Sequence, residues 1–119
     1  MRIAGTPQFR PMEMKLVDDA IDYMQENYMK PISADELSER FLINIKKLQI
    51  GVKKKTGQTI HNFQKTIRLE KAKQLLADRD LTIKEIAFGL GYKRPSHFDE
   101  IFKEHIGITP SQFRLQLTG

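Results

Sequence analysis

Apolar residues recur at steps of three and four along nearly the whole chain, which is the spacing of one face of an α-helix. The first such stripe ends near Pro31, which bars a helix from continuing. No strand candidate is longer than the ambiguous stretch 41–45. The pattern predicts an all-α protein with about seven helices, over 12–28, 34–41, 45–56, 60–77, 83–90, 95–106 and from 110 onward.

Capping residues mark several of the predicted helix starts. Ser33 precedes Glu36 by three positions, and Thr82 precedes Glu85 in the same way. Each pair predicts a capping box, in which side chains and backbone at a helix start satisfy one another's hydrogen bonds. Asn44 is a cap for the helix that follows it.

The chain repeats itself at an offset of 49 residues, with one residue inserted in the second copy. When the two copies are aligned, caps align with caps, core residues with core residues and helix-ending glycines with helix-ending glycines. The aligned pairs include Ser33 with Thr82, Leu37 with Ile86, Leu48 with Phe98, Gly57 with Gly107 and Phe63 with Phe113. Each copy has a short helix, a tight turn and a longer helix, which is a helix-turn-helix unit. Such a unit can place its second helix in the major groove of DNA, although helical pairs of this shape also occur in proteins that bind no DNA.

Positive charge is concentrated in the middle of the chain. The formal net charge is +5. Nine basic residues and a single acid, Glu70, stand between Lys46 and Lys73, whereas acids offset the bases in the first 40 residues. This distribution favours an anionic partner such as nucleic acid, and a solvated basic helix face is the alternative explanation.

Composition and spacing argue against several other classes of protein. The chain has no cysteine, which excludes disulfides and thiolate metal sites, and no apolar run long enough to span a membrane. His61, His97 and His105 lack metal-ligand spacing, and no catalytic constellation is present. We therefore expect no metal, no cofactor, no membrane and no enzyme activity.

The second copy carries an ordered series of motifs. These are LTIKEIA at 81–87, GLGYKRPSHF at 89–98, IFK at 101–103 and GITPSQFR at 107–114. Together they closely resemble the signature of the AraC/XylS family of bacterial transcription regulators. The first copy is similar but looser, and 68–76 resembles the family's linker helix.

This resemblance implies the C-terminal DNA-binding domain of such a regulator, with a homeodomain-like fold. The implied parts are a flexible leader over 1–11, a first helix-turn-helix subdomain over 12–58, a linker helix over 59–77 and a second subdomain over 78–119. The implied function is sequence-specific binding of double-stranded DNA, with two recognition helices in successive major grooves, to regulate transcription in the bacterial cytoplasm, at the nucleoid. Family members usually carry a separate sensing or dimerisation domain, which we expect to be absent from this chain.

The resemblance also assigns residues to the DNA contact. Those that read bases, or lie beside the reading positions, are Lys46, Lys47, Gln49, Ile50, Arg94, Pro95, Ser96, His97 and Glu100. Those expected at phosphates are Asn44, Lys53, Lys54, Thr82, Lys93 and Lys103. Lysine can donate to guanine and glutamine can pair with adenine, whereas phosphate contacts give affinity without sequence information.

The chain departs from the family's usual pattern at several positions. Ile50 stands where arginine is common, and Asp99 and Glu100 stand where neutral or basic residues are common. A carboxylate is unfavourable near phosphates unless it accepts from a cytosine amine. We therefore expect the first copy to dominate affinity. Gly51 lies inside the first reading helix, where we expect it to relieve crowding between helices.

The main alternative function is a helical protein-interaction module that contacts RNA polymerase or another regulator without reading DNA. RNA polymerase is also an expected partner of a DNA-reading regulator. Phe88 is expected at the surface, because its neighbour Ala87 takes the buried position, and an exposed Phe88 would mark a partner surface. Salt-dependent affinity for duplex DNA distinguishes the two functions.

Overall fold

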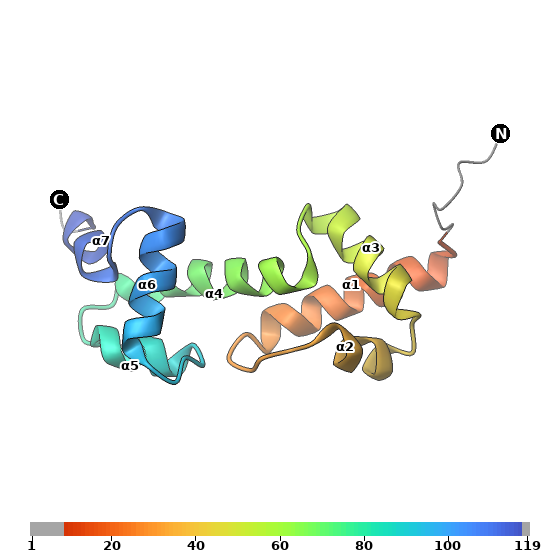
Figure 1. Cartoon of the computed structure of the whole chain (residues 1–119), viewed down its shortest axis with the longest axis horizontal. Coiled ribbons are helices and arrows are strands. Elements are labelled where there is room, and N and C mark those ends of the chain that lie inside the picture. Colours follow the sequence, from red (N-terminus) through yellow and green to blue (C-terminus); the bar gives the residue numbers. More distant parts are fainter. Residues whose placement is uncertain (1–8, 118–119) are drawn as a thin grey trace. The chain divides into compact units, whose positions relative to one another are not determined.

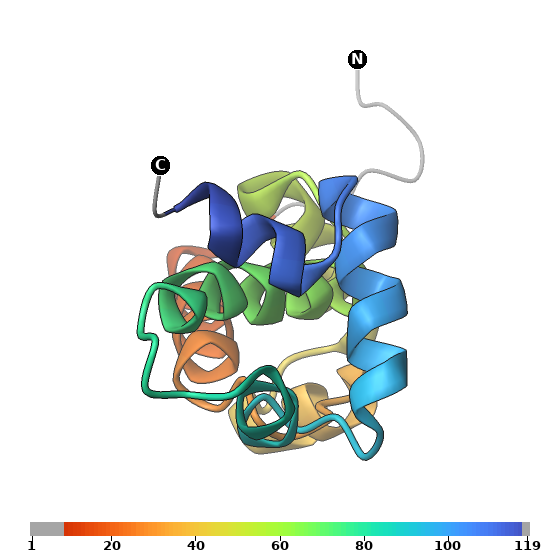
Figure 2. The same ribbon diagram turned by 90° about the vertical axis from the view of Figure 1, so that its left-hand side faces the viewer.

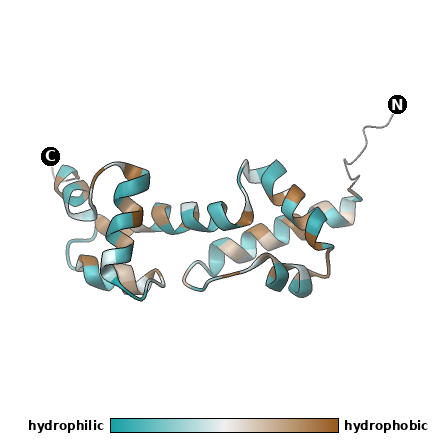
Figure 3. Cartoon of the chain, viewed as in Figure 1, coloured by the Kyte–Doolittle hydropathy of each residue, from teal (hydrophilic) through white to brown (hydrophobic). Residues whose placement is uncertain are grey.

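The computed structural model describes residues 9–117, and in that range it contains seven α-helices and no strand (Figure 1). The helices are α1 (Pro11–Glu26), α2 (Ala34–Phe41), α3 (Ile45–Thr56), α4 (Ile60–Leu76), α5 (Ile83–Gly89), α6 (Pro95–Ile106) and α7 (Pro110–Gln116). The all-α prediction is confirmed. The helices carry both hydrophilic and hydrophobic residues, as expected for amphipathic helices that pack around a core (Figure 3).

The chain divides into two compact units, each of which contains one copy of the repeat. The first unit is formed by the described residues up to Asn27 together with Ile32–Gln64. The second unit is formed by Tyr28–Pro31 together with the described residues from Lys65 onward. The helix α4 begins in the first unit and continues into the second, so the segment expected as a linker contributes residues to both.

The first helix begins one residue earlier and ends two residues earlier than its apolar stripe predicts. Pro11 occupies its first turn, where the missing backbone N–H costs nothing. At the other end, the backbone N–H and the side-chain amide of Asn27 both donate to the carbonyl of Tyr23, which ends the helix. Of the predicted leader, residues 1–8 lie outside the described residues.

The predicted capping boxes form to different extents. Thr82 Oγ1 accepts from the Glu85 amide at 3.0 Å, and the Glu85 carboxylate accepts from the Thr82 amide at 2.9 Å, which completes the second box. Ser33 Oγ accepts from the Glu36 amide at 3.1 Å, but no return bond from the Ser33 amide to Glu36 is present in the described chain. The first box is therefore only half of the predicted motif.

The turns of the two copies share one backbone hydrogen bond. In the first, the Ile43 amide donates to the carbonyl of Ser38 at 3.2 Å, and in the second the Tyr92 amide donates to the carbonyl of Ala87 at 3.1 Å. These donors and acceptors correspond at the same offset of 49 residues that the sequence repeat shows. The repeat in sequence is therefore also a repeat in backbone geometry.

The core of the first unit is largely aliphatic. Six of its side chains are fully buried: Val17, Ala20, Met24, Leu37, Leu48 and Val52. A Cβ atom at Gly51 would lie 2.6 Å from Cγ2 of Val17, so α1 and α3 approach more closely there than a larger residue allows. The expected role of Gly51 in relieving crowding is confirmed.

The core of the second unit is built around a chain of aromatic rings. Adjacent ring centroids are 5.4 Å apart for Tyr92 and Phe98, 5.8 Å for Phe98 and Phe102, and 5.5 Å for Phe102 and Phe113. In Figure 2, α5 lies near the start of α6 and α7 near its end. In the same view, α6 runs from α5 at one end of the unit to α7 at the other end.

Backbone carbonyls at the edge of the second unit are satisfied by arginine side chains. Arg68 Nε donates to the carbonyl of Tyr28 at 2.8 Å, which fixes the short segment Tyr28–Pro31 on this unit. Arg114 donates to the carbonyls of Leu76 and Asp78 at 3.0 and 3.1 Å, and thereby closes the end of α4.

Candidate nucleic-acid interface

The lysines of α3 have two kinds of surroundings: some pair with acids of α1, and others are exposed, with no ion pair in residues 9–117. Lys47 Nζ lies 2.9 Å from a carboxylate oxygen of Glu13, and Lys55 Nζ lies 2.6 Å from one of Asp18. Both acids belong to α1, so these two lysines help to hold α3 against α1. Within the described chain, Lys46, Lys53 and Lys54 form no ion pair, and all three are exposed.

Lys47, a predicted base-contact residue, already has an acidic partner within the protein. Its side chain is 28% exposed and that of Glu13 is 19% exposed, so the pair is partly shielded from water. Glu13 also accepts from the backbone amide of Arg10 at 2.9 Å. That bond, followed by the bond to Lys47, holds the pKa of Glu13 below its usual range. The ammonium group of Lys47 is therefore already engaged by a carboxylate that stays charged.

The other predicted contacts of the first unit lie on the outer side of α3. Lys46 and Gln49 are exposed, and the Ile50 side chain is 38% exposed. Asn44 caps the helix, and its side-chain oxygen accepts from the amides of Lys46 and Lys47 at 2.9 and 3.2 Å. Two backbone donors at this helix start are thus satisfied within the protein.

In the second unit, the predicted base-contact residues cluster at the start of α6. Arg94 is the residue before the helix and makes no side-chain capping bond, and Pro95 occupies the first turn. Ser96 and His97 are exposed, and the His97 ring lies edge-on to Tyr92 with centroids 5.8 Å apart. The remaining predicted residues of this unit, Lys93, Glu100 and Lys103, are also exposed.

The predicted phosphate contact at Thr82 has its polar groups occupied. The Thr82 hydroxyl and amide are both engaged with Glu85 in the capping box. The backbone bond from Thr82 holds the pKa of the Glu85 carboxyl below its usual range, so a negative charge stands at this helix start. A phosphate at Thr82 would have to approach that charge.

The second helices of the two helix-turn-helix units, α3 and α6, differ strongly in charge. The helix α3 carries five lysines and no acid, whereas α6 carries Lys103 together with Asp99, Glu100 and Glu104. Partial burial raises the pKa of Asp99 above its usual range. The electrostatic attraction for a polyanion is therefore concentrated on α3.

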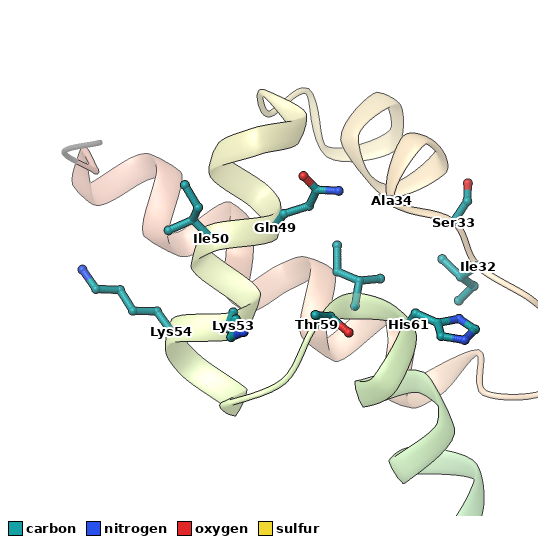
Figure 4. Close-up of a pocket in the computed structure, with 10 residues that line it drawn as sticks. Ile32, Ser33, Ala34, Gln49, Ile50, Lys53, Lys54, Thr59 and His61 are labelled. Atoms are coloured by element: carbon teal, nitrogen blue, oxygen red, sulfur yellow. The ribbon is translucent and has the colours of Figure 1, made fainter. Parts of the chain in front are cut away.

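The structure also gathers residues that sequence reasoning did not connect. Gln49, Ile50, Lys53 and Lys54 of α3 line one pocket together with the residues that begin α2 and α4 (Figure 4). Ser33, Thr59 and His61 contribute polar groups to it. No local pattern indicates this pocket, because its walls come from three separate segments of the chain.

Neither a metal-binding cluster nor a membrane-spanning helix is present in residues 9–117. No group of three or more His, Asp or Glu side chains is placed to hold a metal ion in that part of the chain. Within the same range, none of the helices combines the length and hydropathy that crossing a membrane requires.

The repeated unit of short helix, tight turn and longer helix defines a helix-turn-helix protein. A family model described as a helix-turn-helix domain matches residues 37–116. The chain belongs to the AraC/XylS family of helix-turn-helix domains, which confirms the resemblance inferred from its motifs. The proteins that match the chain are transcription regulators and DNA-binding domains.

Relatives of known sequence and structure agree with this assignment. The transcriptional activator RhaS of Yersinia pestis is 31% identical over 97 residues, which are 82% of this chain and 36% of RhaS. The C-terminal domain of the response regulator YesN from Fusobacterium nucleatum is 32% identical, with a TM-score of 0.70 and coverage of 84% of this chain and 95% of that one. The chain therefore spans about a third of the length of RhaS and nearly all of the YesN domain.

A structure with bound DNA shares the fold. The DNA-binding domain of AdpA, solved in complex with a target DNA, matches with a TM-score of 0.76 over 84% of this chain and 90% of that one. Its identity to this chain is 19%, so the likeness concerns the fold alone.

Proposed function

We propose that the chain binds double-stranded DNA sequence-specifically and regulates transcription in the bacterial cytoplasm. The observation that carries this proposal is the outer side of α3, where Lys46, Lys53 and Lys54 are exposed without acid partners on a helix-turn-helix unit. Membership of the AraC/XylS family supports it further. A cationic helix of this kind is suited to a major groove flanked by phosphates.

In the proposed complex, α3 and α6 read successive major grooves. Gln49 and Lys46 would donate to base edges, and the aliphatic body of Ile50 would contact a thymine methyl group. Lys53, Lys54, Lys93 and Lys103 would contact phosphates. One chain would then read an asymmetric site of about two helical turns, with centres about 34–36 Å apart.

Salt dependence of duplex binding tests the proposal. Duplexes that the chain selects from a random pool are titrated by fluorescence anisotropy at several salt concentrations. If six to ten phosphates are contacted, affinity falls about a thousandfold or more between about 50 and about 200 mM salt. The double variant Lys53→Gln with Lys54→Gln loses two such contacts, so the slope against the logarithm of salt concentration becomes shallower by about 2.

A matched control removes the same charge elsewhere. Lys15 on α1 and Arg79 after α4 lie on neither reading helix. The double variant Lys15→Gln with Arg79→Gln should keep the slope of the unmodified chain. Equal effects of the two double variants, or the absence of any preferred duplex, would contradict the proposal. The second result would favour the interaction module, for which RNA polymerase is the partner to test.

A further inference from the structure

The pocket on the first unit has an apolar floor. Its volume is about 630 Å³, within the range of about 300–1,000 Å³ that small-molecule sites occupy. Ile32 and Ile60, each 6% exposed, line it together with Ala34 and the partly exposed Ile50. A bare ion would leave this apolar surface wetted by water, whereas a ligand with an apolar body would cover it.

The rim of the same pocket is polar and cationic. The residues that line it include Lys53 and Lys54 but no acid. Gln49 extends from α3 toward the start of α2 (Figure 4). Ser33 Oγ accepts from the Glu36 amide and Thr59 Oγ1 accepts from the Asn62 amide, so each hydroxyl still has its own proton to donate. Lys53, Gln49 and the two hydroxyls can donate a hydrogen bond to a negatively charged oxygen in the pocket, whereas the Lys54 side chain extends away from it toward the Phe9 ring (Figure 4).

We propose that this pocket binds a small organic anion with an apolar body, such as an aryl or alkyl carboxylate or sulfonate. The apolar part lies on Ile32, Ala34 and Ile60, and the anionic group lies at Lys53. The ligand and DNA exclude each other, because Gln49, Ile50 and Lys53 would contact both. This second part rests on the proposed function.

A fluorescent anion of this class tests the proposal directly. The probe is anilinonaphthalene sulfonate, which combines fused aromatic rings with one sulfonate. We expect saturable binding of one probe per chain. Amide resonances of Ala34, Lys53 and Ile60 should shift in the probe-bound protein. Shifts confined to other regions would overturn the assignment.

Variants locate the two halves of the ligand. Ala34→Trp fills the apolar floor and should weaken probe binding at least about tenfold, and blue-shifted emission from the introduced indole would report that it occupies the pocket. Lys53→Gln should weaken binding about three- to fivefold, the scale of a solvent-exposed ion pair. Phe88→Ala removes an exposed ring of the second unit and should leave probe binding unchanged. Unchanged binding by folded Ala34→Trp, or equal loss in Phe88→Ala, overturns the proposal.

Competition with DNA separates this inference from the function on which it rests. A duplex selected by the chain should displace the probe at the concentration at which the duplex itself binds. If the chain binds duplex DNA but takes up no probe, the pocket proposal fails and the DNA proposal stands. If the probe binds as described but no duplex does, the DNA proposal fails and the anion site stands without its competitive role.

Discussion

The turns of the two helix-turn-helix units need the same backbone conformation but meet the need with different residues. Leu42 has φ of +54° and Gly91, its counterpart in the repeat, has φ of +95°, so both lie in the left-handed region. Leu42 is 87% exposed, with its side chain in solvent. At Gly91, a Cβ atom would lie 2.2 Å from the carbonyl oxygen of Met29. The left-handed backbone favours glycine in both turns, but only in the second turn does a neighbouring atom, the carbonyl oxygen of Met29, leave no room for a Cβ atom.

The two units also differ in what they offer to a polyanion. The first has an aliphatic core and a lysine-rich helix α3, and α1 holds two of those lysines through Glu13 and Asp18. The second has an aromatic core, and its helix α6 carries three acids. The two units therefore share the backbone geometry of the helix-turn-helix but differ in surface charge.

The largest effect is expected for Gly91→Ala. Left-handed backbone costs a non-glycine residue about 1–2 kcal/mol, and the approach to Met29 adds to this, so we expect a loss of about 3 kcal/mol in the free energy of unfolding. Urea denaturation measures it. Gly57→Ala is the matched control, because Gly57 has φ of +79° with no atom near the added Cβ. Equal losses in the two variants would show that Met29 contributes nothing.

The difference in charge between α3 and α6 predicts unequal losses of DNA affinity. Lys46→Ala removes an exposed donor from α3 and should weaken binding to the selected duplex by about 1–3 kcal/mol. Glu100→Ala removes a carboxylate from α6 and should leave affinity unchanged or slightly raised. Fluorescence anisotropy at fixed salt compares the two. Equal losses would refute the dominance of the first unit.

A smaller effect is expected at the ion pair of Lys47 and Glu13. A double-mutant cycle with Lys47→Met and Glu13→Gln should give a coupling of about 0.5–1 kcal/mol in the free energy of unfolding, since both side chains are partly buried. Lys15 and Asp19, a more exposed pair on α1, should show less coupling. If Lys47→Met changes duplex affinity as much as Lys46→Ala and shows no coupling to Glu13, Lys47 contacts DNA instead.

The smallest effect is expected in the first turn. Leu42→Gly removes the left-handed strain and so stabilises the folded state by about 1–2 kcal/mol. The greater conformational freedom of glycine in the unfolded chain offsets about 0.5–1 kcal/mol of this gain. A net gain of about 0.5 kcal/mol should appear in urea denaturation. Leu42→Ala keeps the Cβ atom and should show no gain. A loss on introducing glycine would mean that the leucine side chain stabilises the turn.

Local features of the fold could be predicted from the sequence. The bounds of α2 and α3, the complete cap at Thr82 and the glycine at the crossing of α1 with α3 all follow from residues close together in the chain or from one unusual residue type. Phe88 was expected at the surface and is 47% exposed, which confirms that expectation. Whether it marks a partner surface stays a prediction.

Features that depend on distant residues could not be predicted in this way. The pairing of Lys47 with Glu13 joins residues 34 positions apart, and nothing near Lys47 indicates it. The left-handed Leu42 was missed because its residue type gives no sign of that conformation. The pocket was missed because its apolar floor and cationic rim come together only in the folded unit.

The exposed position of Leu42 makes the first turn a convenient attachment site. The chain contains no cysteine, so Leu42→Cys would introduce its single thiol, two residues before the cap of α3. A spin label or photo-crosslinker fixed there would project into solvent beside the start of α3. Distances from such a tag to labels on a duplex would report the register of the chain along the DNA.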